Sequence, residues 1–275
     1  MPKVLTDQQI RDYEENGFLF PFTLYSPEQT EALYDKYEDM ETILGEEPQN
    51  KFRVKAHLPF PWLCDLVGDT RLLDAVEDLI GPNIYCWGAS FFTKKAKDPR
   101  FISWHTDTFY YRYDPAETLT AWFSFNESDL ESGCVRYIPG SHKKKAVHDF
   151  FPDSNNLAGQ GQTTRDVDES EAVYAKLRAG QVVFHHESVV HSSLPNKADR
   201  PRIGFSIHYC APHVRETRFD GATAMLLRGE DPYGYWKPDP MPKTDFDPDC
   251  IQAMLDYRQR FKDATDQKVV DGLRT

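Results

Sequence analysis

The sequence lacks the features that mark membrane and secreted proteins. No stretch approaches the roughly 20 consecutive apolar residues that a membrane helix needs, and no apolar segment of a signal peptide follows the N-terminus. The five cysteines are scattered and include no C-x-x-C pair, which argues against a disulfide framework or a cysteine-based zinc site. We therefore expect a soluble, cytoplasmic protein with reduced thiols and no membrane partner.

An excess of basic charge is also lacking. The 275 residues include 32 basic and 44 acidic side chains, for a net charge of -12. Nucleic acids select basic surfaces, so we expect no nucleic acid as a partner. Residues 1–83 alone contain 17 acidic and 7 basic side chains, so the rest of the chain is nearly neutral. The net charge is therefore compatible with a small anionic substrate, and it indicates nothing about oligomeric state.

Helix signals dominate the first part of the chain, and short β segments follow. Capping patterns begin at Thr6 and Ser26, and a third helix is expected near 69–80. Strands are expected at 84–94, 118–126, 134–138, 172–177, 181–186 and 202–210. A last helix should begin at Asp247. Its expected packed side consists of Ile251, Met254, Leu255 and Phe261. Many short strands without alternating helices favour a β sandwich or barrel.

These patterns predict one domain over residues 1–275, mainly β with flanking helices. Residues 1–83 would form a helical wrapping around a β core at 84–210, and 211–275 would form a C-terminal extension. The insert at 148–171 is long and polar, and we expect it to be a loop that covers the functional site.

The tetrapeptide Trp104-His105-Thr106-Asp107 carries the strongest chemical signal. On a strand, His105 and Asp107 would face the same side and present an imidazole and a carboxylate to one point. With a second histidine they would form the 2-His-1-carboxylate set that holds non-haem Fe(II) and leaves positions open. An H-x-D triplet also arises by chance, so this interpretation depends on the second histidine. From the residues alone, the candidates are His185, His186, His191 and His208.

Two expected strands place polar side chains on an inward face. Arg202 lies on the inward side of the strand at 202–210, where an unpaired charge is expensive. A bound anion would remove that cost, because a guanidinium pairs well with a carboxylate. On the strand at 118–126, Thr120 and Trp122 share a polar face. This face indicates either a cavity wall or an edge strand that faces solvent.

The chemical motifs recur in a fixed order along the chain. They are W-H-T-D at 104–107, T-A-W at 120–122, G-C-V-R-Y-I-P-G-S-H at 133–142, V-V-F-H-H-E-S-V-V-H-S-S-L-P-N at 182–196, and Arg202 eleven residues after His191. In order and spacing they resemble the phytanoyl-CoA dioxygenase family of Fe(II)/2-oxoglutarate oxygenases, over roughly residues 5–212. The resemblance implies a double-stranded β-helix core, that is, a cupin-like jelly roll.

The resemblance also implies roles for individual residues. His105, Asp107 and His191 would hold Fe(II), and Arg202 would bind the distal carboxylate of the cosubstrate 2-oxoglutarate, with O2 as the other reactant. Further residues implied for cosubstrate binding are Ser193, Trp122, Lys94 and Thr120. His185 and His186 fall at positions that are usually not ligands, so we expect supporting or packing roles for them.

For the reaction, the resemblance implies hydroxylation. Halogenating relatives carry a small residue in place of Asp107, which leaves room for chloride. Substrate contacts are expected after the H-x-D motif and near residue 55. The candidates are Tyr110, Tyr111, Arg112, Lys55 and His57. Aromatic and cationic groups suit a small polar or anionic metabolite, such as an amino acid, an ectoine-like or a 2-aminoethylphosphonate-like compound, or a natural-product intermediate. For the tyrosines, strand packing is the alternative.

Two other classes of function remain open at this stage. A non-catalytic jelly-roll binding module would explain the strands without any iron chemistry. A metal-dependent cupin-type isomerase or hydrolase would use a similar set of ligands but would not need Arg202. Binding of 2-oxoglutarate that depends on Arg202 distinguishes the oxygenase from both alternatives.

Overall fold

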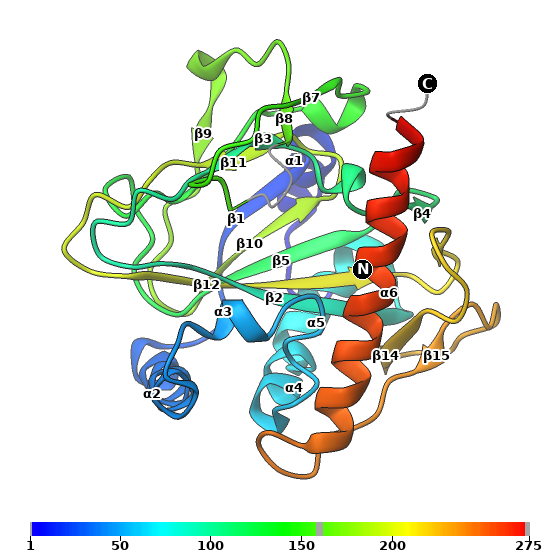
Figure 1. Cartoon of the computed structure of the whole chain (residues 1–275). Coiled ribbons are helices and arrows are strands. Elements are labelled where there is room, and N and C mark those ends of the chain that lie inside the picture. The colour runs from blue at the N-terminus through cyan, green and yellow to red at the C-terminus, as the bar shows by residue number, and fades with distance from the viewer. Residues whose placement is uncertain (1, 158–161, 273–275) are drawn as a thin grey trace.

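The computed structural model describes residues 2–157 and 162–272, and in this part of the chain two β-sheets lie one above the other, with helices covering the outer face of the larger sheet (Figure 1). The α-helices are α1 (Asp7–Asn16), α2 (Pro27–Leu44), α3 (Pro48–Lys51), α4 (Pro61–Val67), α5 (Thr70–Ile80) and α6 (Pro248–Gly272). The 3-10 helices are η1 (Asp107–Phe109), η2 (Ser141–Lys143) and η3 (Glu169–Glu171).

The larger sheet has seven strands. In spatial order they are β1 (Phe18–Thr23), β10 (Gln181–His186), β5 (Leu119–Ser124), β12 (Arg202–Cys210), β2 (Ile84–Lys94), β14 (Thr223–Arg228) and β15 (Lys237–Pro238). The smaller sheet consists of β3 (Ile102–His105), β11 (His191–Ser193), β6 (Val135–Tyr137) and β9 (Val173–Tyr174). Two short pairs join β4 (Tyr113–Asp114) to β13 (Arg215–Glu216), and β7 (His148–Phe150) to β8 (Gln162–Thr164). This arrangement confirms the predicted β core with flanking helices.

Local sequence explains where the first helices begin and end. Thr6 and Ser26 are the N-caps of α1 and α2, and each forms the predicted capping box. Both helices end at glycines in the left-handed conformation, Gly17 and Gly45, with φ of 84° and 66°. The predicted third helix is α5, with Asp69 as its N-cap.

Two predictions about the outer elements were wrong. Residues 1–83 are not only helical, because β1 pairs with β10 and extends the larger sheet. On the other side of this sheet, β14 of the C-terminal part pairs with β2. The insert at 148–171 is not a plain loop, since its described parts, 148–157 and 162–171, contain the β7–β8 pair and η3, while residues 158–161 lie outside the described residues.

The packed side of α6 also differs from the prediction at one position. Leu255 is exposed, while Met254 and Tyr257 are buried. The buried positions Cys250, Met254 and Tyr257 follow the three- and four-residue spacing of a helix, and this spacing leaves Leu255 on the solvent side.

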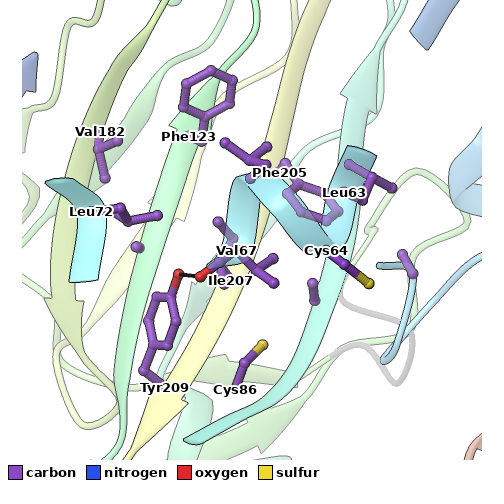
Figure 2. Close-up of a cluster of buried hydrophobic side chains, with 14 of the residues drawn as sticks. Leu63, Cys64, Val67, Leu72, Cys86, Phe123, Val182, Phe205, Ile207 and Tyr209 are labelled. Carbon is purple, nitrogen blue, oxygen red and sulfur yellow. Dashed lines mark hydrogen bonds between the residues drawn. The ribbon is translucent and has the colours of Figure 1, made fainter. Parts of the chain in front are cut away.

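The main hydrophobic core lies between the larger sheet and helices α4 and α5 (Figure 2). Leu63, Val67 and Leu72 of these helices pack toward the outward side chains of the central strands, which include Phe205 and Ile207 of β12. Tyr209 joins the two layers, because its hydroxyl donates a hydrogen bond to the Val67 carbonyl at 2.7 Å. The other face of the same strands is therefore free to line a cavity between the sheets.

Candidate active site

Three side chains from the two strands β3 and β11 and the turn after β3 meet between the sheets. His105 and His191 are direct partners in the antiparallel pairing of β3 with β11. Asp107 follows two residues after the end of β3, and its Oδ1 lies 3.7 Å from His105 Nε2 and 3.9 Å from His191 Nε2. One ligand atom from each of the three residues lies within 4.8 Å of the other two. These distances allow all three atoms to reach one metal ion.

Asp107 reaches this point by a different route from the one predicted. Residue 105 ends the strand, and Asp107 begins η1, so strand alternation does not align it with His105. Instead, the backbone N–H of Asp107 donates to the Glu187 carbonyl at 2.8 Å and fixes the turn. Its Oδ2 faces His185 Nε2 at 3.5 Å, and the Thr120 hydroxyl donates to Oδ2 at 3.4 Å. The carboxylate is thus oriented by side chains of β10 and β5.

Both histidines of the cluster present a free nitrogen to it. His105 Nδ1 lies 2.9 Å from the Ser103 carbonyl, and His191 Nδ1 lies 3.0 Å from the Val189 carbonyl. A carbonyl accepts a hydrogen bond from Nδ1–H, which places the proton on Nδ1 and leaves the Nε2 lone pair free on the side of Asp107. Burial lowers the pKa of each histidine to about 4, so both imidazoles are neutral at pH 7.

The charge at the cluster is therefore that of one carboxylate. Burial alone would raise the pKa of Asp107, but the close imidazole of His185 and those of His191 and His105 hold it below its usual range. An anionic carboxylate and two neutral imidazoles with open space beside them are the donor set that non-haem Fe(II) takes. The cluster fits such an ion.

A cavity of about 220 Å³ opens beside the cluster. It is lined by Gln49, Arg53, Val54, Trp87, Ser90, Phe91, Phe92, Ile102, His105, Asp107, Tyr110, Tyr111, Trp122, Val135, Leu157, His185, His191, Ser192, Ser193, Arg202, Ser206, His208 and Phe261. Its volume is below the roughly 300–1,000 Å³ of sites for drug-sized ligands. The space therefore suits small molecules.

One end of the cavity is basic and closed. Arg202 is 1% exposed, donates to the carbonyls of Gly133 and Phe92, and leaves Nε without a hydrogen-bond partner among the described residues. Trp122 lies beside it, with the guanidinium 5.2 Å from the ring centroid. Gly204 makes room for this ring, because a Cβ there would come within 1.9 Å of it.

Lys94 adds a second basic group next to Arg202. It lies opposite Arg202 in the register of β2 and β12, and its Nζ donates a hydrogen bond to the Ser193 hydroxyl at 2.7 Å. Burial, and then the charge of Arg202, lower the pKa of Lys94 to about 5, and burial lowers that of Arg202 to about 10. No carboxylate of the described residues forms an ion pair with either group. At pH 7 the buried charge at this end is therefore that of Arg202. An incoming carboxylate would compensate this charge, so this end fits the distal carboxylate of 2-oxoglutarate.

The structure brings some predicted substrate residues to the cavity and not others. Tyr110 and Tyr111 line it, whereas Arg112 is exposed and does not. Lys55 was also wrongly predicted, because it is fully buried and its ammonium lies 2.6 Å from Asp239. The prediction that His57 contacts the substrate was also wrong, because this side chain is buried away from the cavity. It is fully buried behind the sheet, next to Cys86 and outside the cavity lining.

Two sets of residues received no specific prediction and still reach the cavity. His208, considered only as a possible ligand, accepts or donates a hydrogen bond with Thr120 at 3.0 Å and stacks on Trp87. Arg53 and Phe261 come from the segment after α3 and from α6, far from the motifs in the sequence. No periodic pattern indicates them, because only tertiary packing brings these segments to the cavity. Thr120 also lies beside Asp107, whereas the resemblance implied a contact with the cosubstrate.

Glu187 gives a prediction for the pH dependence of stability. Its side chain is buried, Oε1 accepts from Thr118 N–H at 2.8 Å, and Oε2 has no partner among the described residues. Burial raises its pKa from 4.5 to about 8. The folded protein therefore keeps a proton that the unfolded chain releases, so this residue stabilises the fold fully below pH 4.5 and less as pH rises through 8.

We expect Glu187→Gln to flatten this profile. Above pH 8 the variant should unfold with a free energy larger than that of the wild type by a few kcal/mol, since each pKa unit corresponds to about 1.4 kcal/mol. Urea unfolding across pH measures the difference. Wild-type and variant curves that stay parallel from acid to alkaline pH would show that Glu187 does not carry a raised pKa.

The fold and the site together define a class of protein, a double-stranded β-helix with a His-Asp-His cluster beside a basic pocket. The family model described as phytanoyl-CoA dioxygenase (PhyH) matches residues 13–204. The chain therefore belongs to the phytanoyl-CoA dioxygenase family. This family uses Fe(II), 2-oxoglutarate and O2, which confirms the predicted cofactors.

Individual relatives agree with this assignment. The chain is 28% identical over 126 residues to a phytanoyl-CoA dioxygenase domain-containing protein 1 homolog of Dictyostelium discoideum, covering 44% of this chain and 45% of that protein. It is 25% identical over 252 residues to the peroxisomal phytanoyl-CoA dioxygenase of Bos taurus, covering 82% and 75%. The chain thus spans less than half the length of the Dictyostelium relative.

Among solved structures, the non-heme monooxygenase ThoJ in its apo form is similar to the chain. The TM-score is 0.80 with 28% identity, over 96% of this chain and 99% of that one.

A search of the described helices for a membrane span found none with the length and apolar character that one requires.

Proposed function

We propose that the protein is an Fe(II)- and 2-oxoglutarate-dependent hydroxylase of a small polar or anionic metabolite. One observation carries this proposal: the His105–Asp107–His191 cluster and the uncompensated Arg202 open into the same cavity. Neither a non-catalytic binding module nor a cupin-type isomerase requires this combination.

In the proposed site, His105 Nε2, His191 Nε2 and an Asp107 oxygen hold Fe(II). When bound, the iron with 2-oxoglutarate and O2 would supply an oxidant strong enough to attack C–H bonds. Amino-acid side chains alone cannot supply such an oxidant. Arg202 binds the distal carboxylate of 2-oxoglutarate, with Lys94 and Ser193 next to it and Trp122 as a wall. Arg202 thereby fixes the orientation of the cosubstrate.

The rest of the site positions the substrate and excludes water. Tyr110 and Tyr111 form an aromatic wall next to the cluster. We propose that the described parts of the insert, 148–157 and 162–171, cover the site. This is supported by Leu157, which lines the cavity, and by Phe150, whose ring lies 5.5 Å from that of Phe109. Exclusion of water protects reactive species during turnover.

The test is a screen of small amino acids, carboxylates and phosphonates for compounds that stimulate succinate formation by the Fe(II)-loaded protein. We expect the product of a stimulating compound to gain one oxygen atom, derived from labelled O2. A product that forms without O2 would instead indicate an isomerase or hydrolase. Absence of affinity for 2-oxoglutarate would indicate a binding module.

A further inference from the structure

A second arginine, Arg53, lines the cavity, and unlike Arg202 it is exposed to solvent. Arg202 is buried, whereas Arg53 lines the same cavity and is exposed, so Arg53 lies at the mouth. The backbone holds it there, because Val54 N–H donates to the Ser90 hydroxyl of β2 at 2.9 Å and Arg53 Nε donates to the Gln49 carbonyl at 2.7 Å. Within the described ranges, no hydrogen bond or ion pair uses the terminal nitrogens of Arg53.

Arg53 has no acidic partner in the described part of the chain. No carboxylate forms an ion pair with it, although residues 1–83 are rich in acidic side chains. Partial loss of water around the side chain, and then the charges of Arg258 and Arg100, lower the pKa of Arg53. Arg100 is already paired with Asp98 and Glu47, at 2.5 and 2.9 Å.

Arg258 likewise forms no ion pair with an acidic side chain of the described residues. It comes from α6, and its guanidinium donates to the Lys51 carbonyl at 3.1 Å. Arg53 and Arg258, from opposite ends of the chain, are thus close enough to repel one another, and neither forms an ion pair with a carboxylate of the described residues. Like charges in such an arrangement are costly, and a bound anion relieves that cost.

The walls of the cavity are largely apolar. Phe261 of α6, Leu157 and Ile102 line it, together with Tyr110. The Tyr110 ring centroid lies 6.0 Å from that of His105, and its hydroxyl is buried without a hydrogen-bond partner among the described residues. The cavity thus suits a ligand with an apolar body and one polar group near the metal cluster.

We propose that the substrate carries an anionic carboxylate or phosphate group that Arg53 binds at the cavity mouth, while its apolar body extends past Phe261 and Tyr110 toward His105 and Asp107. This inference rests on the proposed function and specifies its substrate class. It also assigns to Arg53 the specificity that the sequence had suggested for Arg112. The planar fork of a guanidinium suits either oxyanion.

The test measures binding to the protein loaded with Fe(II) and 2-oxoglutarate under anaerobic conditions. The probes are 3-phenylpropionate, 2-phenylethyl phosphate and the neutral 3-phenylpropionamide, each titrated by calorimetry. We expect at least one anion to bind about tenfold or more tightly than the amide, the effect of one charge-assisted hydrogen-bonded pair near a surface. Which anion binds better distinguishes a carboxylate from a phosphate site.

Arg53→Ala should remove this preference, and Arg53→Lys should keep part of it. Arg112→Ala is the matched control, because Arg112 is an exposed arginine outside the cavity, and it should behave as the wild type. All variants should bind 2-oxoglutarate within about twofold of the wild type. An equal or weaker affinity for both anions than for the amide, or a preference that survives Arg53→Ala, overturns the inference. If the wild type itself does not bind 2-oxoglutarate, the proposed function is overturned instead.

Discussion

His191→Ala should weaken metal binding more than 100-fold and abolish iron-dependent turnover. Loss of an outer partner of a metal ligand already costs about 10- to 100-fold in metal affinity, and His191 would be a direct ligand. Its Nε2 lies 3.9 Å from Asp107 Oδ1, and it faces His105 across β3 and β11. Metal affinity is measured by equilibrium dialysis with Fe(II) under anaerobic conditions.

His186→Ala is the matched control for this change. His186 lies five residues away, at the end of β10, and its ring packs against His142 instead of the cluster. We expect it to retain wild-type metal binding. If His191→Ala kept its iron and its 2-oxoglutarate decarboxylation while His186→Ala lost them, the ligand assignment would be wrong.

Arg202→Ala should lower the affinity for 2-oxoglutarate by roughly 100-fold to several thousand-fold. Loss of one partner of a buried ion pair costs about 3–5 kcal/mol, and every 1.4 kcal/mol is tenfold in Kd. The guanidinium is buried, and a neutral water in the space left by the truncation would not supply its charge to the cosubstrate carboxylate. Calorimetry with the metal-loaded protein measures this loss.

Arg200→Ala serves as the control for Arg202→Ala. Arg200 lies two residues earlier and pairs with Asp129 at 2.6 Å in a partly exposed position. Exposed pairs contribute about 0–1 kcal/mol, so this variant should bind 2-oxoglutarate as the wild type does. Unchanged affinity in Arg202→Ala, with a folded protein by circular dichroism, would favour the cupin-type isomerase or hydrolase.

The sequence predicted the elements whose side chains alternate or cap clearly. The strand at 202–210 matches β12 to the residue, because both of its faces follow a strict period of two. The helices that begin after Thr6 and Ser26 also match, because their capping boxes are local. β1 escaped prediction, since its pairing with β10 joins residues more than 150 positions apart.

The site shows the same division between local and tertiary information. His105 and His191 meet because strand register brings them together, and the motifs already contained both. The position of Asp107 depends on a hydrogen bond to Glu187, which no local pattern encodes. Lys55 was misplaced because its partner Asp239 is 184 residues away, and the contact turns an apparent surface charge into a buried pair.

The central claim is that this cavity couples 2-oxoglutarate to O2 through a metal held by His105, Asp107 and His191. The most direct test incubates the wild-type protein and His191→Ala with Fe(II) and 2-oxoglutarate and measures succinate with and without O2. The account predicts succinate from the wild type only when both Fe(II) and O2 are present, and none above background from His191→Ala. Equal succinate formation by the two proteins, or formation by the wild type without O2, would contradict it.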